Sequence, residues 1–206
     1  MRAGVFGGTF DPIHLGHLAA ARAIRTALKL DKVIFVPAGQ PWMKAGMPVS
    51  PVKDRVEMVR LAVARHKAFE LCTIEADRTG PSYAVDTMDT LRRQMGRGSD
   101  LFFLLGSDAL TDIAKWREPQ RLIRLCQLVA YARPRCRLPK KEALELAVPG
   151  VSQRVTFVQV PQVDIRATDI RRRVAEGRSI QRLVPRAVER YILEHGLYGT
   201  ASQRTA

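Results

Sequence analysis

Residues 5–17 read Val5-Phe6-Gly7-Gly8-Thr9-Phe10-Asp11-Pro12-Ile13-His14-Leu15-Gly16-His17, and this stretch predicts the fold. An apolar start runs into two adjacent glycines, and a helix-like pattern of apolar residues begins near Leu15. A strand that turns through glycines into a helix brings backbone N–H groups, at the positive end of the helix, to the end of the strand. The stretch therefore predicts a phosphate-binding turn.

Two histidines follow the glycines at a spacing of three. At the start of a helix this spacing puts the rings of His14 and His17 on one side, facing the same volume. Imidazoles there can donate hydrogen bonds to phosphate oxygens and carry positive charge. A zinc pair is the alternative, but zinc needs three or four ligands, and no further His or Cys stands at ligand spacing. Phosphate binding is the favoured interpretation.

The run from Gly7 to His17 resembles the G-G-x-F-D-P-x-H-x-G-H signature of the nucleotidyltransferase superfamily. Members of this superfamily condense a nucleoside triphosphate with a phosphorylated partner and release pyrophosphate. The resemblance implies that both histidines act on the phosphates. The ATP contacts that it implies in this run are Gly7, Gly8, Thr9, Phe10, His14 and His17.

Composition limits the class of protein. With 206 residues, 46% of them hydrophobic, the chain can bury a core of ordinary size. We expect one domain over residues 1–198, whose residues 164–198 form a small helical C-terminal part, and a disordered polar tail at 199–206. No apolar run approaches the length of a membrane span, and the N-terminus leaves no room for a signal peptide. These features predict a soluble, cytoplasmic protein without a membrane partner.

The chain is strongly basic. Lys and Arg number 34 against 20 Asp and Glu, a net charge of +14, which indicates a polyanionic partner or a basic surface. Nucleotides and nucleic acids both fit that description. The three cysteines, Cys72, Cys126 and Cys136, stand at wide spacings that fit neither a disulfide framework nor a metal site. We interpret them as buried or incidental thiols.

Strand and helix patterns alternate along the chain. Apolar positions recur at helical spacing over residues 15–30, the run 33–36 predicts a strand, and Ser50-Pro51 opens a helix whose basic residues, Arg55 among them, are interpreted as scaffold. The alternation predicts an α/β fold, a Rossmann-like doubly wound parallel sheet with ligands at the carboxyl ends of its strands. Further strands are predicted at 71–74, 101–105, 128–133 and 155–160, and further helices from Ser82, over 142–146 and over 184–193.

A loop follows the second predicted strand. Residues 37–48 contain three prolines and two glycines, too many for regular structure, so we expect a loop over the strand ends. Lys44 in this loop is either an exposed solubilising lysine or a phosphate ligand. In the adenylyltransferases that the N-terminus resembles, a lysine of the matching loop meets the ATP phosphates. The resemblance therefore implies a catalytic Lys44 that also contacts the mononucleotide.

Residues 80–87, Gly-Pro-Ser-Tyr-Ala-Val-Asp-Thr, predict a helix start with Ser82 as its N-cap. This stretch resembles the P-S-Y-T-x-D-T element of the nicotinate-nucleotide adenylyltransferases, in which the helix start receives the pyridine ring and its carboxylate. The resemblance implies mononucleotide contacts from Ser82, Tyr83 and Ala84. Ala84 stands where this branch usually has Thr, so one hydroxyl is missing from the pocket while backbone N–H groups remain.

The most apolar run, residues 101–105, predicts a central parallel strand ending at Gly106-Ser107-Asp108, beside the glycine turn. Asp108 suits a helix cap, but the resembled branch has a G-[AS]-D-A element here whose Asp meets the ribose of the mononucleotide. Trp116 has the spacing of a core residue, whereas a Trp at this point of the branch stacks on the nicotinate ring. The resemblance thus adds ATP contacts from Gly106 and Asp108, and mononucleotide contacts from Gly8, Asp108 and Trp116. Arg133 stands at the carboxyl end of the strand predicted over 128–133, from which its guanidinium can reach the site, so we expect it to contact the mononucleotide as well.

A second anion site is predicted at residues 164–171, Asp-Ile-Arg-Ala-Thr-Asp-Ile-Arg. Thr168 is a natural N-cap, and Arg171 falls in the first turn of the helix. Cations at a helix N-terminus oppose its dipole by roughly 0.3–1 kcal/mol each, so Arg166 and Arg171 make sense with an anion between them. The stretch resembles the I-S-S-T-x-x-R motif, which holds the β- and γ-phosphates of ATP, and implies contacts from Ile165, Thr168 and Arg171. Arg166 stands where Ser is usual.

These elements occur in family order over residues 2–198 and predict the activity. We expect an adenylyltransferase that joins ATP and nicotinate mononucleotide, giving deamido-NAD and pyrophosphate by in-line transfer without a covalent enzyme intermediate. The catalytic residues would be His14, His17, Lys44 and Arg171. Mg²⁺ is expected to be carried mainly by the ATP phosphates, without a metal site on the protein.

Other activities compete with this interpretation. Pantetheine-phosphate or cytidylyl transfer would share the glycine turn and the Thr168 motif, whereas Asp108 and Trp116 favour the pyridine branch. A basic nucleic-acid-binding domain is suggested by the charge and by residues 171–173, three consecutive arginines, but no aromatic platform accompanies them. The H-x-G-H run alone also fits a fragment of a tRNA synthetase. We expect no nucleic-acid partner, and a homo-oligomer is compatible with the sequence.

Overall fold

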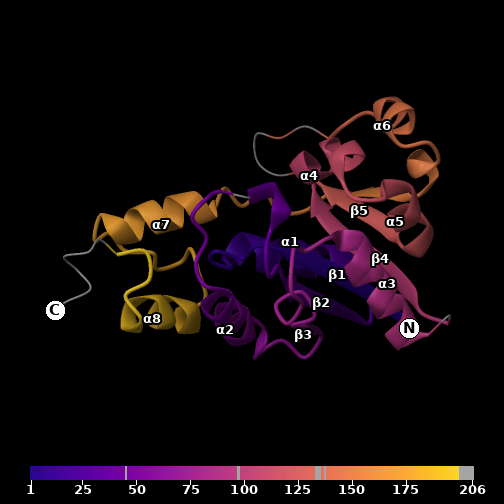
Figure 1. Ribbon diagram of the computed structural model, residues 1–206. Coiled ribbons are helices and arrows are strands. Elements are labelled where there is room, and N and C mark those ends of the chain that lie inside the picture. Colours follow the sequence, from indigo (N-terminus) through magenta and orange to yellow (C-terminus); the bar gives the residue numbers. More distant parts are fainter. Residues whose placement is uncertain (45, 97, 133–135, 137, 200–206) are drawn as a thin grey trace.

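The computed structural model describes residues 1–44, 46–96, 98–132, 136 and 138–199, and Figure 1 shows its arrangement. A six-stranded sheet lies at the centre, with the strand order β3-β2-β1-β4-β5-β6. Every adjacent pair runs parallel. The strands are β1 (Arg2–Gly8), β2 (Lys32–Pro37), β3 (Phe69–Leu71), β4 (Asp100–Gly106), β5 (Gln127–Tyr131) and β6 (Val155–Val158).

The strand order reverses between β1 and β4, which pair with Val5 opposite Phe103. In an open parallel sheet, ligands bind outside the carboxyl ends of the strands at such a switch point. The doubly wound fold predicted from the sequence is confirmed. Gly7 and Gly8 are the last residues of β1, and the turn that follows them, residues 9–12, is called the glycine turn below. It lies at this switch point together with Gly106 at the end of β4.

Helices cover both faces of the sheet (Figure 1). They are α1 (Leu15–Ala27), α2 (Val52–Val63), α3 (Ala84–Met95), α4 (Ser107–Thr111), α5 (Pro119–Leu125), α6 (Lys141–Ala147), α7 (Ala167–Ala175) and α8 (Arg186–Glu194). Short 3-10 turns occupy Trp42–Lys44, Ile113–Lys115 and Val151–Gln153.

Two apolar layers fill the space between sheet and helices. Phe6, Phe35 and Leu104 pack with α1, α2, α7 and α8, whereas their chain neighbours Val5 and Phe103 pack with α3, α4, α5 and α6. Successive side chains of a strand point to opposite faces, so a strand buried on both sides must be apolar throughout. This requirement explains why the continuous runs 33–36 and 101–105 form inner strands.

Some boundaries differ from the sequence-based expectation. The helix predicted over 15–30 ends at Ala27, because Lys29 adopts a left-handed backbone with φ of 50°. The strand predicted at 71–74 lies at Phe69–Leu71, since the chain turns where the Asp77 N–H bonds to the Thr73 carbonyl (2.9 Å). The breaker-rich loop 37–48 contains a 3-10 turn, Trp42–Lys44.

The C-terminal helices return to the N-terminal half of the chain. Helix α8 packs against α2, and the Tyr191 hydroxyl donates to the buried Asp54 carboxylate at 2.9 Å. Over the part of the chain that the structure describes, no helix has the length and apolar character needed to span a membrane.

Candidate active site

The predicted histidine pair lies at the start of α1. His14 precedes the first helical residue, and its ring stacks on that of His17, with centroids 3.6 Å apart and planes at 24°. His14 is 7% exposed and His17 is half-buried. The structure thus brings both imidazoles to the carboxyl end of the central strands, as the spacing of three predicts.

A backbone contact indicates the tautomer of the neutral His17 ring. The His14 backbone N–H donates to His17 Nδ1 at 3.3 Å, so Nδ1 carries the lone pair. In a neutral imidazole the proton then sits on Nε2, which becomes a hydrogen-bond donor. His17 is therefore prepared to donate from Nε2 to a phosphate oxygen.

Two backbone N–H groups at the start of α1 already make hydrogen bonds within the protein. The Leu15 backbone N–H, one of the groups expected to face a phosphate, donates to the Leu183 carbonyl at 2.9 Å. The His17 backbone N–H lies 3.0 Å from the His14 carbonyl. These two N–H groups therefore bond within the protein, whereas the sequence analysis expected the backbone at this helix start to face a phosphate.

Phe10 supports His17 from behind. Its ring is 3% exposed and meets the His17 ring edge-to-face, with centroids 5.2 Å apart. A Cβ at Gly8 would stand 3.0 Å from the Phe10 ring, so only glycine leaves room for the aromatic ring at the strand end. Phe10 was predicted as an ATP contact, but with its ring in the core it can meet a nucleotide only through its backbone.

Arg55 was interpreted from the sequence as scaffold, and the structure shows which segments it holds. Its side chain is 1% exposed, and its guanidinium reaches into the site from α2. NH1 donates to the Thr9 carbonyl (2.9 Å) and the Ala38 carbonyl (2.6 Å). Arg55 thereby joins the glycine turn to the loop after β2, a contact that helical periodicity does not reveal.

The second predicted anion site, at residues 164–171, is linked to the glycine turn through Arg171. Helix α7 begins at Ala167 with Arg166 as its N-cap, so the predicted N-cap role of Thr168 is wrong. The extended backbone of Arg166 (φ −121°, ψ 136°) starts the helix one residue before Thr168, which leaves Arg171 beyond its first four residues. Arg171 NH1 donates to the Asp11 carbonyl at 2.7 Å, which places its guanidinium beside the glycine turn.

Arg166 does not share that placement. Its side chain is exposed and lies 3.8 Å from the Asp164 carboxylate, which offsets its charge at the helix start. Thr168 is exposed as the second residue of α7. Of the two arginines expected to enclose an anion, Arg171 is the one that the structure joins to the N-terminal turn.

The start of α3 differs from its predicted capping. Tyr83 is the N-cap of α3, and Ser82 is 8% exposed with its hydroxyl turned to the loop after β2. Ser82 Oγ accepts hydrogen bonds from the backbone N–H groups of Gly39 (2.9 Å) and Gln40 (3.3 Å). The predicted N-cap role of Ser82 is wrong because these groups occupy its oxygen, and Ser82 instead joins two loops.

Glu75 lies beneath this junction and was not singled out in the sequence. It is 6% exposed and accepts a hydrogen bond from the Thr87 hydroxyl at 2.7 Å. Burial raises the pKa of its carboxyl above the ordinary value, and hydrogen bonds from Thr87 and Ser82 offset part of that rise. Glu75 thus holds α3 through Thr87, and this role can be recognised only in the tertiary structure.

An aromatic cluster stands at the α3 start. Trp42 lies 6.2 Å from Tyr83 between ring centroids, and the Arg117 guanidinium lies over the Tyr83 ring at 4.9 Å. Trp116 is half-buried and packs edge-on against Phe103 at 5.8 Å. Its buried Nε1 has no hydrogen-bond partner within the described residues. Trp42 and Arg117 thus contact Tyr83, one of the residues predicted to bind the pyridine ring, and the sequence analysis singled out neither.

The remaining predicted residues fall in two groups. Gly106 is the N-cap of α4, and Asp108 is exposed as the second residue of that helix, at the end of β4. Arg133 and the side chain of Lys44 lie outside the described part of the structure. The backbone of Lys44 ends the 3-10 turn that begins at Trp42.

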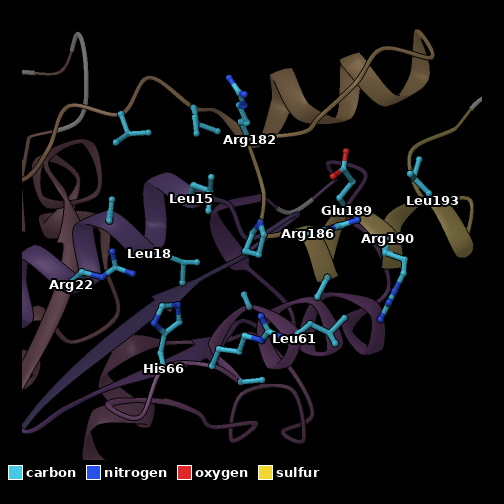
Figure 2. A pocket seen from close by; sticks show the side chains of 18 residues that line it. Leu15, Leu18, Arg22, Leu61, His66, Arg182, Arg186, Glu189, Arg190 and Leu193 are labelled. Atoms are coloured by element: carbon cyan, nitrogen blue, oxygen red, sulfur yellow. The ribbon is translucent and has the colours of Figure 1, made fainter.

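A groove of about 1160 Å³ lies on the other face of α1 (Figure 2). Leu15, Leu18 and Arg22 line it at helical spacing, which places it away from the His17 side of the helix. Ile165, a predicted ATP contact, lines this groove. Its rim carries part of the basic charge of the chain, in Arg22, Arg65, Arg182, Arg186 and Arg190.

The fold and the site define a class. A parallel sheet with stacked histidines and an arginine at its switch point is the architecture of a nucleotide-binding α/β protein that handles phosphates. The family model described as cytidylyltransferase-like matches residues 5–173.

Curated relatives identify the family more closely. A nicotinate-nucleotide adenylyltransferase of Thermus thermophilus is 48% identical over 198 residues, covering 96% of this chain and 100% of the relative. One of Thermomicrobium roseum is 44% identical over 199 residues, covering 97% and 92%. The chain belongs to the nicotinate-nucleotide adenylyltransferases of the cytidylyltransferase-like family.

Solved structures share the fold. The nicotinic acid mononucleotide adenylyltransferase of Plasmodium falciparum complexed with NaAD superimposes with a TM-score of 0.75, over 96% of this chain and 97% of that one. Its sequence is 18% identical, so the likeness concerns the architecture.

Proposed function

We propose that this protein transfers the adenylyl group of ATP to nicotinate mononucleotide, giving deamido-NAD and pyrophosphate. The observation that carries this proposal is that His17, from α1, and Arg171, from α7, both lie beside the glycine turn. His17 stacks on His14 at 3.6 Å, and Arg171 bonds to the Asp11 carbonyl at 2.7 Å. The family membership supplies the identity of the two substrates.

The reaction is an in-line displacement. A phosphate oxygen of the mononucleotide attacks the α-phosphorus of ATP, the new P–O bond forms, and the bond to the β-phosphate breaks so that pyrophosphate leaves. The attacking oxygen is already anionic, so no general base is required. The protein aligns two polyanions and stabilises the charge that spreads onto the α-phosphate and pyrophosphate.

Each phosphate contact has a chemical role. His17 donates from Nε2, because its Nδ1 is held by the His14 backbone. A fixed donor aimed at developing charge typically contributes about 10²–10³ in rate. Arg171 keeps guanidinium N–H groups beyond the one on Asp11 for the β- and γ-phosphates of ATP. We assign Lys44 to the same phosphates, with Gly7, Gly8 and Thr9 lining the turn.

The mononucleotide is assigned to the α3 side. The N-terminus of α3, with Tyr83 as its N-cap, has the positive end of a helix dipole, and Arg117 adds a cation over the Tyr83 ring at 4.9 Å. Both features suit the carboxylate of a nicotinate ring. Trp116 offers an indole face for stacking, and Asp108 at the end of β4 is assigned to the ribose.

Mg²⁺ would enter with ATP, as its phosphate complex. Among the described residues, no group of three or more His, Cys, Asp or Glu side chains is arranged to hold a metal ion. Phosphate oxygens and water would therefore provide most ligands, and the ion supplies charge neutralisation on the triphosphate.

A panel of substrates tests the proposed function. Purified protein would be incubated with ATP or CTP and with nicotinate mononucleotide or phosphopantetheine, and pyrophosphate release would be measured. We expect release that requires ATP together with nicotinate mononucleotide, and a dinucleotide product with the mass of deamido-NAD. Faster release with phosphopantetheine or CTP would reject the assignment.

A further inference from the structure

Asp11 is bonded to three distant parts of the chain. Its Oδ1 accepts a hydrogen bond from the Tyr198 hydroxyl (2.6 Å), and its Oδ2 accepts one from the Ser50 backbone N–H (3.1 Å). Its backbone carbonyl accepts the bond from Arg171 (2.7 Å). Asp11 is 4% exposed. A residue of the glycine turn is thus held from the loop before α2, from α7 and from the segment after α8.

The Tyr198 hydroxyl stays protonated and can therefore donate its hydrogen bond to Asp11 throughout the physiological pH range. Burial, and then the negative charge of Asp11, raise the pKa of the Tyr198 hydroxyl above its ordinary value, so it keeps its proton over the physiological range. Tyr198 itself adopts a left-handed backbone with φ of 65°, which is uncommon for a residue with a Cβ. The chain after α8 is therefore shaped so that this hydroxyl reaches the turn.

Arg55 holds Thr9, two residues before Asp11 in the glycine turn. Besides the Thr9 and Ala38 carbonyls, its guanidinium donates to the carbonyls of Ser50 (2.9 Å) and Gly39 (3.0 Å). A buried guanidinium that donates to several backbone oxygens fixes them in a rigid planar pattern. Thr9 and Asp11 are both restrained in this way.

Phe10, between Thr9 and Asp11, has a strained backbone. Phe10 adopts φ of 49°, a left-handed conformation that a bulky side chain avoids unless its surroundings impose it. This conformation directs the Phe10 ring against His17, at 5.2 Å between centroids. The contacts on Thr9 and Asp11 are the surroundings that impose it.

We propose that Tyr198 and Arg55 are positioning residues that hold the Thr9–Asp11 segment in this strained form. The held segment places the Phe10 ring behind His17 and the Asp11 carbonyl under Arg171. Both residues thus act on the reaction through the turn without touching a substrate. The expected effects on turnover rest on the proposed function, whereas the effect on the His17 ring does not.

Tyr198→Phe tests the proposal, and Tyr191→Phe is its matched control. Each variant removes one phenolic hydroxyl of the C-terminal segment that donates to a buried aspartate, Tyr198 to Asp11 and Tyr191 to Asp54. Asp54 lies in α2, outside the glycine turn. We expect Tyr198→Phe to lower kcat about 10- to 100-fold, because small displacements of catalytic groups have effects of this size. Tyr191→Phe should leave kcat within about twofold at a similar loss of melting temperature.

A second measurement does not depend on turnover. In protein with isotope-labelled histidine, the NMR signals of the His17 ring report its position against the Phe10 ring, because the ring current of a nearby aromatic group shifts them. We expect the same His17 ring signals in the wild type and in Tyr191→Phe, and displaced signals in Tyr198→Phe, where the Phe10 ring is no longer held at 5.2 Å from His17. A failure of the proposed function would leave this comparison intact. An unchanged His17 spectrum in Tyr198→Phe, or equal losses of kcat in both variants, would overturn the positioning role.

Discussion

The His17 side chain is defined by two contacts of different kinds. The His14 backbone N–H selects its tautomer at 3.3 Å, and the Phe10 ring restricts its orientation at 5.2 Å. A neutral imidazole with a fixed Nε2–H donates without first having to be reoriented, which is the condition under which hydrogen bonds stabilise a transition state most. In the proposed reaction the donor geometry of His17 thus depends on its two neighbours, His14 and Phe10.

Replacing His17 by alanine removes that donor. We expect His17→Ala to lower kcat by about 100-fold or more while the melting curve stays close to that of the wild type. His66→Ala is the control, since His66 is a partly buried histidine that lies beside Phe69 on the groove side of α1. Comparable turnover in both variants would contradict the role of His17.

Glu75 gives the stability a pH dependence of known sign. Its pKa is raised by burial, so the folded protein binds this proton more tightly than the unfolded chain does. The contribution of Glu75 to stability therefore falls as pH rises from about 4 through the raised pKa. In Glu75→Gln this dependence is removed. We expect the unfolding free energy of wild type minus variant to decrease as the pH rises above about 4 in denaturant titrations, and a constant or rising difference would refute this.

In the proposed reaction, helices α7 and α3 serve different substrates. Helix α7 reaches the glycine turn through Arg171, whereas the α3 start carries Tyr83 and the Arg117 cation. Arg171 lies one turn into α7, whereas Arg117 lies over the Tyr83 ring at the start of α3, and a guanidinium at either place suits an anionic group. The phosphates of ATP and the carboxylate of the mononucleotide are the anions that the proposed reaction provides.

Arg171→Ala should affect ATP above all. Hydrogen bonds to charged groups contribute about 1.5–3 kcal/mol, so we expect ATP binding to weaken about tenfold or more, and mononucleotide binding by less than about threefold. Arg172→Ala is the matched control, because Arg172 is exposed and pairs with Asp169 at 3.0 Å. Titration calorimetry with each substrate measures the two affinities. Equal weakening for both substrates would place the ATP phosphates elsewhere.

Preference for the acid over the amide is expected at the α3 start. Donors and a cation suit the carboxylate of nicotinate mononucleotide, whereas the amide turns an NH₂ group toward them and leaves at least one group unpaired at roughly 1–3 kcal/mol. That cost corresponds to a ratio in kcat/KM of about 10- to 100-fold. Steady-state kinetics with both mononucleotides at fixed ATP gives this ratio. Parity, or a preference for the amide, would mean that the pyridine ring binds at another place.

Across the whole molecule, the sheet and the histidine pair could be predicted because their signals are local. The runs 33–36 and 101–105 are continuous apolar stretches, and the two histidines stand three residues apart. The support of the site could not be predicted in this way. Arg55 meets Thr9 across 46 positions of sequence, and Tyr198 meets Asp11 across 187. No periodicity links positions so far apart.

The wrong capping predictions have a related cause. Ser82 and Thr168 are residue types that favour an N-cap, but propensity is weak where tertiary contacts compete. The loop after β2 takes the Ser82 oxygen, and an extended Arg166 starts α7 before Thr168. In both places a contact or conformation set by the whole fold decides where the helix begins.

The transfer itself is tested most directly by the configuration at the α-phosphorus. Adenosine 5′-(α-thiotriphosphate) of one configuration would be incubated with the protein and nicotinate mononucleotide, and the configuration of the thio-dinucleotide would be determined. A single in-line attack by the mononucleotide phosphate predicts a dinucleotide with inverted configuration. A dinucleotide that retains the configuration would contradict the account, because two successive displacements through an adenylylated protein would then be required.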